Sequence, residues 1–324
     1  MLLEIRHVTQ YQYAEPVRES VMELWMQPQR SQRQRLLSFE LEVEPAAQLF
    51  SYADSFGNAV YHFDVPPPHQ RLQIVARSAV ETQPPDPLPD AVDRGEWDRL
   101  RSDFIQGACF DFLRPHGFAR RTAALAAFVE RRGLDDLCRF DPLTAARQLG
   151  GEIYEAFDYE PGVTEADSPV DHALQEGRGV CQDFAHIMIA ICRSWGLPAR
   201  YVSGYLFTSR SEGHERSDPD ATHAWVEVFL PSLRWVGFDP TNDMPACERH
   251  VAVAVGRDYG DIPPSRGVFK GEAESHLAVG VSVRQSRAAH AEPEFLRIAK
   301  PPFPTPRKRL RAPGLIDQQQ QQQQ

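Results

Sequence analysis

Cysteine is scarce in this sequence, and long apolar runs are missing from it. The 324 residues include five cysteines, an odd number at widely separated positions, and no CxxC pair. Neither a zinc ribbon nor a disulfide framework is therefore indicated. No run approaches the ~18 apolar residues that a membrane span requires, and residues 1–7 contain no apolar segment typical of a signal peptide. We expect a soluble, cytoplasmic protein with no membrane partner.

Basic residues are also in deficit. The chain has 35 Lys and Arg against 45 Asp and Glu, which gives a net charge of −10. Proteins that bind nucleic acid present an excess of positive charge, so we do not expect nucleic acid as a partner. The hydrophobic content of 42% and the charged content of 25% are typical of a soluble globular protein. The length suggests roughly two domains of ~150 residues each, and it leaves the oligomeric state open.

The first part of the chain reads as β-structure. Apolar and polar residues alternate in short segments, most clearly over residues 37–44. The pair Gly57-Asn58 separates two such segments, which is a hairpin signature. We predict an antiparallel, β-sandwich-like domain over residues 1–82. Residues 83–96 are rich in proline and form a predicted linker.

Helical periodicity dominates the next hundred residues, and strand-like segments follow it. Blocks of helices followed by strands indicate an α+β fold, here a central helix packed on an antiparallel sheet. We assign this core to residues 97–285. The polar segment 208–219 is a predicted loop. Residues 286–324, rich in proline, arginine and glutamine, form a predicted disordered tail. The strands expected in the core are residues 199–207, 221–230, 234–239, 251–259 and 277–283.

A cysteine stands where a glycine-containing loop meets a helix. Residues 177–180 include two glycines and precede Cys181, and the apolar run 184–195 ends at Gly196 and Pro198, a helix stop signal. Cys181 therefore lies at a helix N-terminus, where free N–H groups and the macrodipole favour negative charge. This placement favours the nucleophilic thiolate. The alternative is an ordinary, small core residue.

Two downstream strands carry the other groups that thiol chemistry requires. His223 opens an apolar strand, and Asp239 ends another, because Pro240 cannot donate to a ladder. A thiol needs a base, and an imidazole needs a third group that fixes its tautomer. In a simple hairpin without a bulge, His223 and Asp239 share one face only if odd residues stand opposite odd ones, for example Phe229 opposite Trp235.

Four sequence motifs resemble those of a known protein family. They are Gly-Val-Cys-Gln-Asp-Phe-Ala-His (179–186), Gly-Leu-Pro-Ala-Arg-Tyr-Val-Ser-Gly-Tyr (196–205), His-Ala-Trp-Val-Glu-Val (223–228) and Gly-Phe-Asp-Pro-Thr-Asn (237–242). Together they resemble the transglutaminase-like superfamily in its bacterial branch. Residues 1–80 resemble the β domain that precedes the core in those proteins.

The resemblance implies a papain-like core with a catalytic Cys-His-Asp triad at Cys181, His223 and Asp239. It implies acyl transfer on protein or peptide amides through a thioester, with resolution by an amine or by water left open. The backbone N–H of Cys181 is one expected oxyanion donor, and Tyr159 and Gln175 are the candidates for the second. The alternative is a catalytically silent peptide-binding module on the same fold.

No cofactor or metal is expected. A zinc site at the three triad positions would require more His or Cys ligands. Asp218 and Asp220 flank a polar loop, but their spacing is not that of an EF-hand.

Other residues near these motifs have structural explanations. Trp225 and Trp235 are expected to be mostly core, with one of them lining a substrate channel. Asp183 is expected to cap the helix that begins at Cys181. His186 lies about 140° around that helix from Cys181, and we expect it to pack or to be hydrogen bonded. Cys192 is expected to be inert packing.

Overall fold

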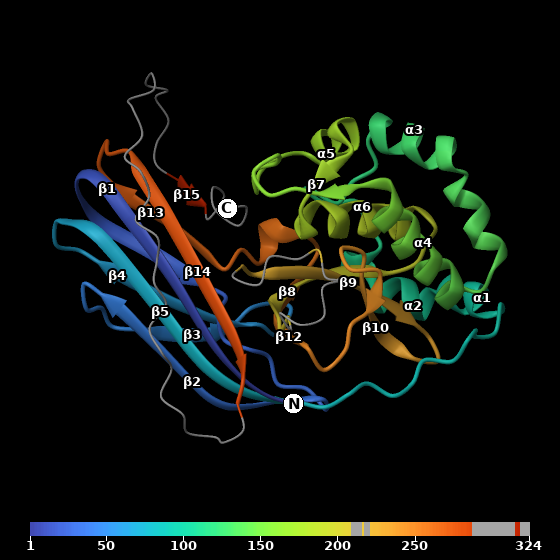
Figure 1. Ribbon diagram of the computed structural model, residues 1–324, viewed down its shortest axis with the longest axis horizontal. Coiled ribbons are helices and arrows are strands. Elements are labelled where there is room, and N and C mark those ends of the chain that lie inside the picture. The colour runs from blue at the N-terminus through green and yellow to red at the C-terminus, as the bar shows by residue number, and fades with distance from the viewer. Residues whose placement is uncertain (209–215, 217–220, 287–314, 318–324) are drawn as a thin grey trace.

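The computed structural model describes residues 1–208, 216, 221–286 and 315–317. Asp218 and Asp220 lie outside these residues, as do most of the predicted polar loop and most of the predicted tail. Within the tail, residues 315–317 form the short strand β15 (Leu315–Asp317). Figure 1 shows a sheet built around the N-terminal strands on the left and a core of helices and strands on the right. Among the described residues, no helix is both long and apolar enough to cross a membrane.

One long strand organises the N-terminal part. β1 (Leu2–Leu24) changes its register between Gln12 and Val17 and so takes part in two sets of antiparallel pairs. Its first half pairs with β5 (His69–Thr82) and β14 (Ser275–Gln285). Its second half pairs with β4 (Ala59–Val65) and β13 (Ser265–Lys270). The outer strands are β2 (Gln34–Glu44) on β5, β3 (Phe50–Ala53) on β4, and β15 on β13.

The last two long strands of the described chain therefore belong to the N-terminal sheet. The assignment of residues 97–285 to one continuous core does not anticipate this pairing. Residues 277–283 do form a strand, as predicted, but this strand, β14, pairs with residues 3–13 of β1 and not with the core sheet. Local alternation identifies a strand without naming its partner, which is set by the sheet edge that only the folded chain presents.

The core contains the predicted central helix on an antiparallel sheet. α6 (Cys181–Ser194) packs on β8 and β9, and all but one of its residues are buried. The sheet has the order β11-β10-β9-β8-β12. Its strands are β8 (Ala199–Leu206), β9 (His223–Leu230), β10 (Arg234–Asp239), β11 (Met244–Pro245) and β12 (His250–Gly256).

The remaining α-helices lie on the core side of the molecule, to the right of the N-terminal sheet in Figure 1. Two begin at side-chain caps: Thr122 accepts a hydrogen bond from the backbone of Leu125, and Asp141 accepts from those of Leu143 and Thr144. The helices are α1 (Glu96–Leu100), α2 (Asp103–Ala108), α3 (Ala123–Arg132), α4 (Pro142–Ala156) and α5 (Val170–Glu176), with 3₁₀ turns η1 (Phe110–Phe112), η2 (Leu134–Arg139) and η3 (Tyr259–Asp261). The short strands β6 (Asp158–Tyr159) and β7 (Arg178–Gly179) pair in parallel just before α6.

The N-terminal part covers the open edge of the core sheet with two side-chain amides. Asn58 accepts from the N–H of Val255 and donates to its carbonyl, both at 2.8 Å. Gln34 makes the same pair of bonds with Ala252, at 2.9 and 2.8 Å. β12 is the edge strand, so these amides replace the partner strand that it lacks. The turn Gly57-Asn58 thereby connects the two parts of the molecule.

Replacing Asn58 by alanine is expected to lower the free energy of unfolding by about 2–4 kcal/mol, because the N–H and the carbonyl of Val255 both lose their partner in a buried place. Urea denaturation of the full chain measures this loss. Gln73→Ala, which removes a side chain hydrogen bonded at the exposed surface to Arg71, is the control. Equal losses in the two variants would contradict a special role for Asn58.

Candidate active site

Cys181 is the first residue of α6. Val180 before it has an extended backbone, and its N–H donates to Oδ2 of Asp183 at 2.9 Å. Thr164 Oγ1 donates to the same oxygen at 2.6 Å, and burial raises the pKa of Asp183 to about 6. Asp183 thus caps the helix, as predicted. The thiol of Cys181 lies at the positive end of the helix dipole, and the residue is 9% exposed.

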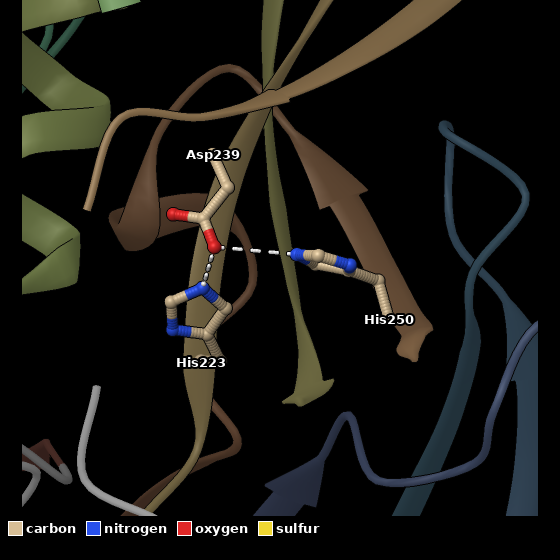
Figure 2. Close-up of side chains that lie close together, drawn as sticks. All are labelled: His223, Asp239 and His250. Carbon is tan, nitrogen blue, oxygen red and sulfur yellow. Dashed lines mark hydrogen bonds and ion pairs between the residues drawn. The ribbon is translucent and has the colours of Figure 1, made fainter. Parts of the chain in front are cut away.

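The hairpin of β9 and β10 has the register that the sequence requires. Trp235 stands opposite Phe229, which confirms that odd residues face odd residues. His223 and Asp239 consequently meet at one end of the sheet, with Nε2 of His223 2.8 Å from Oδ2 of Asp239. Figure 2 shows this contact and a second imidazole, that of His250, on another side of the same carboxylate.

The carboxylate of Asp239 is buried and densely hydrogen bonded. Oδ2 also accepts from Nε2 of His250 at 3.2 Å and from Nδ2 of Asn242 at 2.7 Å, and Oδ1 accepts from the N–H of Thr241 at 3.0 Å. Burial alone would raise the pKa of Asp239, but the charge of His223 and the hydrogen bonds from both histidines hold it far below its usual range. Asp239 is therefore an acceptor only.

His223 interacts with both the carboxylate and the thiol. Burial alone would lower the pKa of His223, but the charge of Asp239 and hydrogen bonds with Asp239 and Cys181 raise it well above the usual value. Because Nε2 faces Asp239, the other ring nitrogen, Nδ1, is left for the sulfur. Because the pKa of His223 is higher in the folded than in the unfolded chain, its protonation stabilises the folded protein. This stabilisation is complete below the unfolded pKa of ~6.5 and is lost as the pH rises through the folded pKa. The raised pKa therefore favours the imidazolium form of His223, in which Nδ1 holds a proton given up by the thiol of Cys181.

The chain matches known protein families in two places. Residues 3–81 match the bacterial transglutaminase-like N-terminal region, and residues 139–240 match the transglutaminase-like superfamily. A protein of Mycobacterium leprae is 33% identical over 281 residues, which are 87% of this chain and 98% of that protein. The chain belongs to the transglutaminase-like superfamily.

Two further relatives extend this result. A crystal structure of a candidate cysteine protease from Cytophaga hutchinsonii superposes with a TM-score of 0.66 at 22% identity, over 89% of this chain and 92% of that one, and shows the same fold. A protein-glutamine gamma-glutamyltransferase of Pseudomonas aeruginosa is 34% identical over 95 residues, which are 26% of this chain and 13% of that protein.

The two oxyanion candidates of this transglutaminase-like protein differ in their placement. Tyr159 lies in β6 and is partly buried. It stands opposite Gly179 of β7, and Gly179 precedes Cys181 by two residues. Gln175 is exposed on α5. Their roles as oxyanion donors stay predictions.

Trp225 and Trp235 line one pocket of about 870 Å³. Cys247 and His250 also line it, whereas Cys181 and His223 are absent from its described lining. The pocket thus lies on the His250 side of Asp239. Trp225 is only 2% exposed, in agreement with a core role. The role of either tryptophan in a substrate channel stays a prediction.

The sequence reasoning missed His250. This histidine opens β12 as His223 opens β9, in front of an apolar segment, Val-Ala-Val-Ala-Val. That similarity was the available signal, but the strand was predicted to begin one residue later. By contrast, His186 is a packed residue as predicted, because its Nε2 accepts from the N–H of Tyr259 at 3.2 Å and its ring stacks on Tyr201.

His223, Asp239 and His250 also place potential metal-ligand atoms within 4.8 Å of one another. Both imidazoles, however, direct Nε2 at the same carboxylate oxygen, at hydrogen-bond distance. A metal would have to displace the protons that these nitrogens donate to Asp239. The contacts of the three side chains fit a hydrogen-bonded network.

Iodoacetamide is expected to alkylate Cys181 about tenfold or more faster at pH 7 than Cys138 or Cys192. Burial raises the pKa of Cys138 to about 11, and Cys192 is 0% exposed, with its pKa also raised by burial. Cys181 instead has the charged His223 beside it. Peptide mass mapping measures each site separately, including Cys247. Alkylation of Cys138 as fast as that of Cys181 would contradict an activated thiol.

Proposed function

We propose that this protein catalyses cysteine-dependent acyl transfer on protein or peptide amides, with Cys181 as nucleophile, His223 as base and acid, and Asp239 as the group that orients His223. The observation that carries the proposal is the imidazole of His223, hydrogen bonded both to the Cys181 thiol and to the Asp239 carboxylate. The family and the name of the Pseudomonas aeruginosa relative support the same class.

The geometry suits a two-step reaction. Nδ1 of His223 takes the proton of the thiol, and the sulfur of Cys181 attacks the amide carbonyl carbon. The C–N bond then breaks, and His223 returns the proton to the departing ammonia or amine. A thioester remains on Cys181. Water or a primary amine attacks this thioester, loses its proton to His223 and frees the thiol.

Asp239 has two tasks in this cycle. Its contact with Nε2 keeps Nδ1 of His223 directed at the sulfur, and its charge stabilises the imidazolium while the thiolate is present. We take the N–H groups at the start of α6 as donors to the oxyanion of the tetrahedral intermediate, a role supported by Cys181 being the first residue of that helix.

The test uses glutamine-containing peptides incubated with the full chain, with and without an excess of a primary amine such as putrescine. Mass spectrometry separates three products: glutamate from hydrolysis, an amine adduct from transamidation, and new chain ends from cleavage of the backbone. We expect at least one of them, and none with Cys181→Ala. Cys138→Ala is the matched control, because it removes a thiol outside the site.

The outcomes of this test distinguish an active acyltransferase or hydrolase from a catalytically silent peptide-binding module. Product formation that Cys181→Ala abolishes and Cys138→Ala leaves unchanged supports the proposal. A protein that forms none of the three products, and whose Cys181 is alkylated no faster than Cys138, is a catalytically silent peptide-binding module on the same fold.

A further inference from the structure

A second buried histidine contacts the proposed catalytic carboxylate. Nε2 of His250 lies 3.2 Å from Oδ2 of Asp239, the same oxygen that faces His223. The side chain of His250 is 2% exposed. The ring of Trp225 packs against it edge to face, with 5.1 Å between the ring centroids. The proposed reaction assigns no role to this residue.

The contacts of His250 fix its tautomer. The backbone N–H of Cys247 donates to Nδ1 of His250 at 3.1 Å, so Nδ1 carries a lone pair and no proton. The proton of the neutral ring is therefore on Nε2, where it is donated to Asp239. The sulfur of Cys247 lies 3.7 Å from Nδ1, but that nitrogen is already occupied. Burial alone would raise the pKa of Cys247, but the contact with His250 lowers it, so the Nδ1 side of the ring faces Cys247 and the Nε2 side serves Asp239.

We propose that His250 is a positioning residue, which holds the carboxylate of Asp239 by a neutral Nε2–H donor so that its charge stays directed at His223. Three donors converge on Oδ2: His223, His250 and the amide of Asn242. A carboxylate held in this way has a single orientation. Without His250 the carboxylate keeps the donors Asn242 and Thr241 but loses one of its buried contacts, so it holds the ring of His223 less firmly toward the sulfur.

This inference rests on the proposed role of Cys181 as nucleophile. It differs from a purely structural role in what it predicts. His250 acts through the hydrogen bond that it donates. A side chain that supplies a donor at the same place, and that does not titrate, is therefore expected to preserve the function of His250. Glutamine meets this condition, because its Nε2 occupies a place similar to Nε2 of histidine, whereas leucine fills the volume without a donor.

The experiment compares His250→Leu, His250→Gln and a matched control, His7→Leu. His7 is equally buried, and its described hydrogen bonds are to Tyr205 at 3.0 Å and Thr9 at 3.3 Å rather than to a residue of the proposed triad. Two kinds of measurement are made on each variant: kcat and KM on the best glutamine-containing peptide, and the rate of alkylation of Cys181 by iodoacetamide. The alkylation rate needs no substrate, so it tests His250 even if the proposed function fails.

We expect His250→Leu to lower kcat and the alkylation rate about tenfold, a factor that corresponds to ~1.4 kcal/mol, with KM changed less than about twofold. His250→Gln is expected to stay within about threefold of the wild type, and His7→Leu within about twofold. Unchanged rates in His250→Leu would overturn the proposal. Equal losses in the leucine and glutamine variants would also overturn it, because the donor would then have no importance.

A measurement on the unaltered protein covers the case in which His250→Leu does not fold. Histidine labelled with ¹⁵N in the full chain reports the tautomer of each ring by NMR. We expect His250 at pH 8 as the neutral ring with a protonated Nε2 and an unprotonated Nδ1. A proton on Nδ1 of His250, in either a neutral or a charged ring, would contradict the proposal.

Discussion

Replacing Asp239 by asparagine is expected to lower kcat by about 10³–10⁴-fold, the size of effect known for this change in a catalytic triad. Asparagine keeps the shape of the side chain but loses the charge that raises the pKa of His223. Its NH₂ group would also face one of the donors that Asp239 now accepts from, either an imidazole or the amide of Asn242. The measurement is kcat together with the alkylation rate of Cys181.

Asp258→Asn is the matched control for this prediction. The carboxylate of Asp258 is also buried, at 1% exposed, and it accepts from Nδ1 of His116 at 2.8 Å and from the N–H of Phe118 at 3.0 Å. It has no hydrogen bond to the proposed triad among the described contacts. We expect Asp258→Asn to cost stability but to change kcat of the folded protein only slightly. Similar losses of kcat in both variants would show that the effect of Asp239→Asn is on folding.

Replacing Gly204 by alanine is expected to lower the free energy of unfolding by about 3 kcal/mol. A Cβ at this position would lie 2.1 Å from the backbone oxygen of Val251 and 2.8 Å from the ring of Trp225. Gly204 stands in β8 opposite His223 on one side and Ala252 on the other. The backbone of β12 cannot yield as a flexible side chain does, so the strands have to separate. Urea denaturation measures the loss.

Gly150→Ala is the control for the glycine change. Gly150 lies within α4, and a Cβ there would meet no atom within 4 Å. Alanine favours the helix, so we expect this variant to gain about 0.5–1 kcal/mol. A loss at Gly204 no larger than ~0.5 kcal/mol would mean that the core sheet adapts. We also expect folded Gly204→Ala to be less active, because β12 begins with His250.

The sequence alone predicted the local placement of each residue of the proposed triad. Gly196 and Pro198 end the helix, and the loop before Cys181 begins it, so the thiol had to lie at a helix N-terminus. The strict alternation of side chains made His223 and Asp239 meet only in one parity of the hairpin, and the observed pairing of Phe229 with Trp235 is of that parity. Helix start and stop signals and the alternation of side chains along a strand depend only on neighbouring residues, so they can be identified in the sequence.

Only the tertiary structure decided which distant segments converge. β14 returns to β1 across more than 260 residues, and no local pattern names that partner. His250 contacts Asp239 although β8 and β9 separate their strands in the sheet, because the strand ends meet there and Gly204 leaves room for the ring of Trp225. Strand order and the space left by a missing side chain are properties of the packed molecule, because they depend on contacts between residues far apart in the chain.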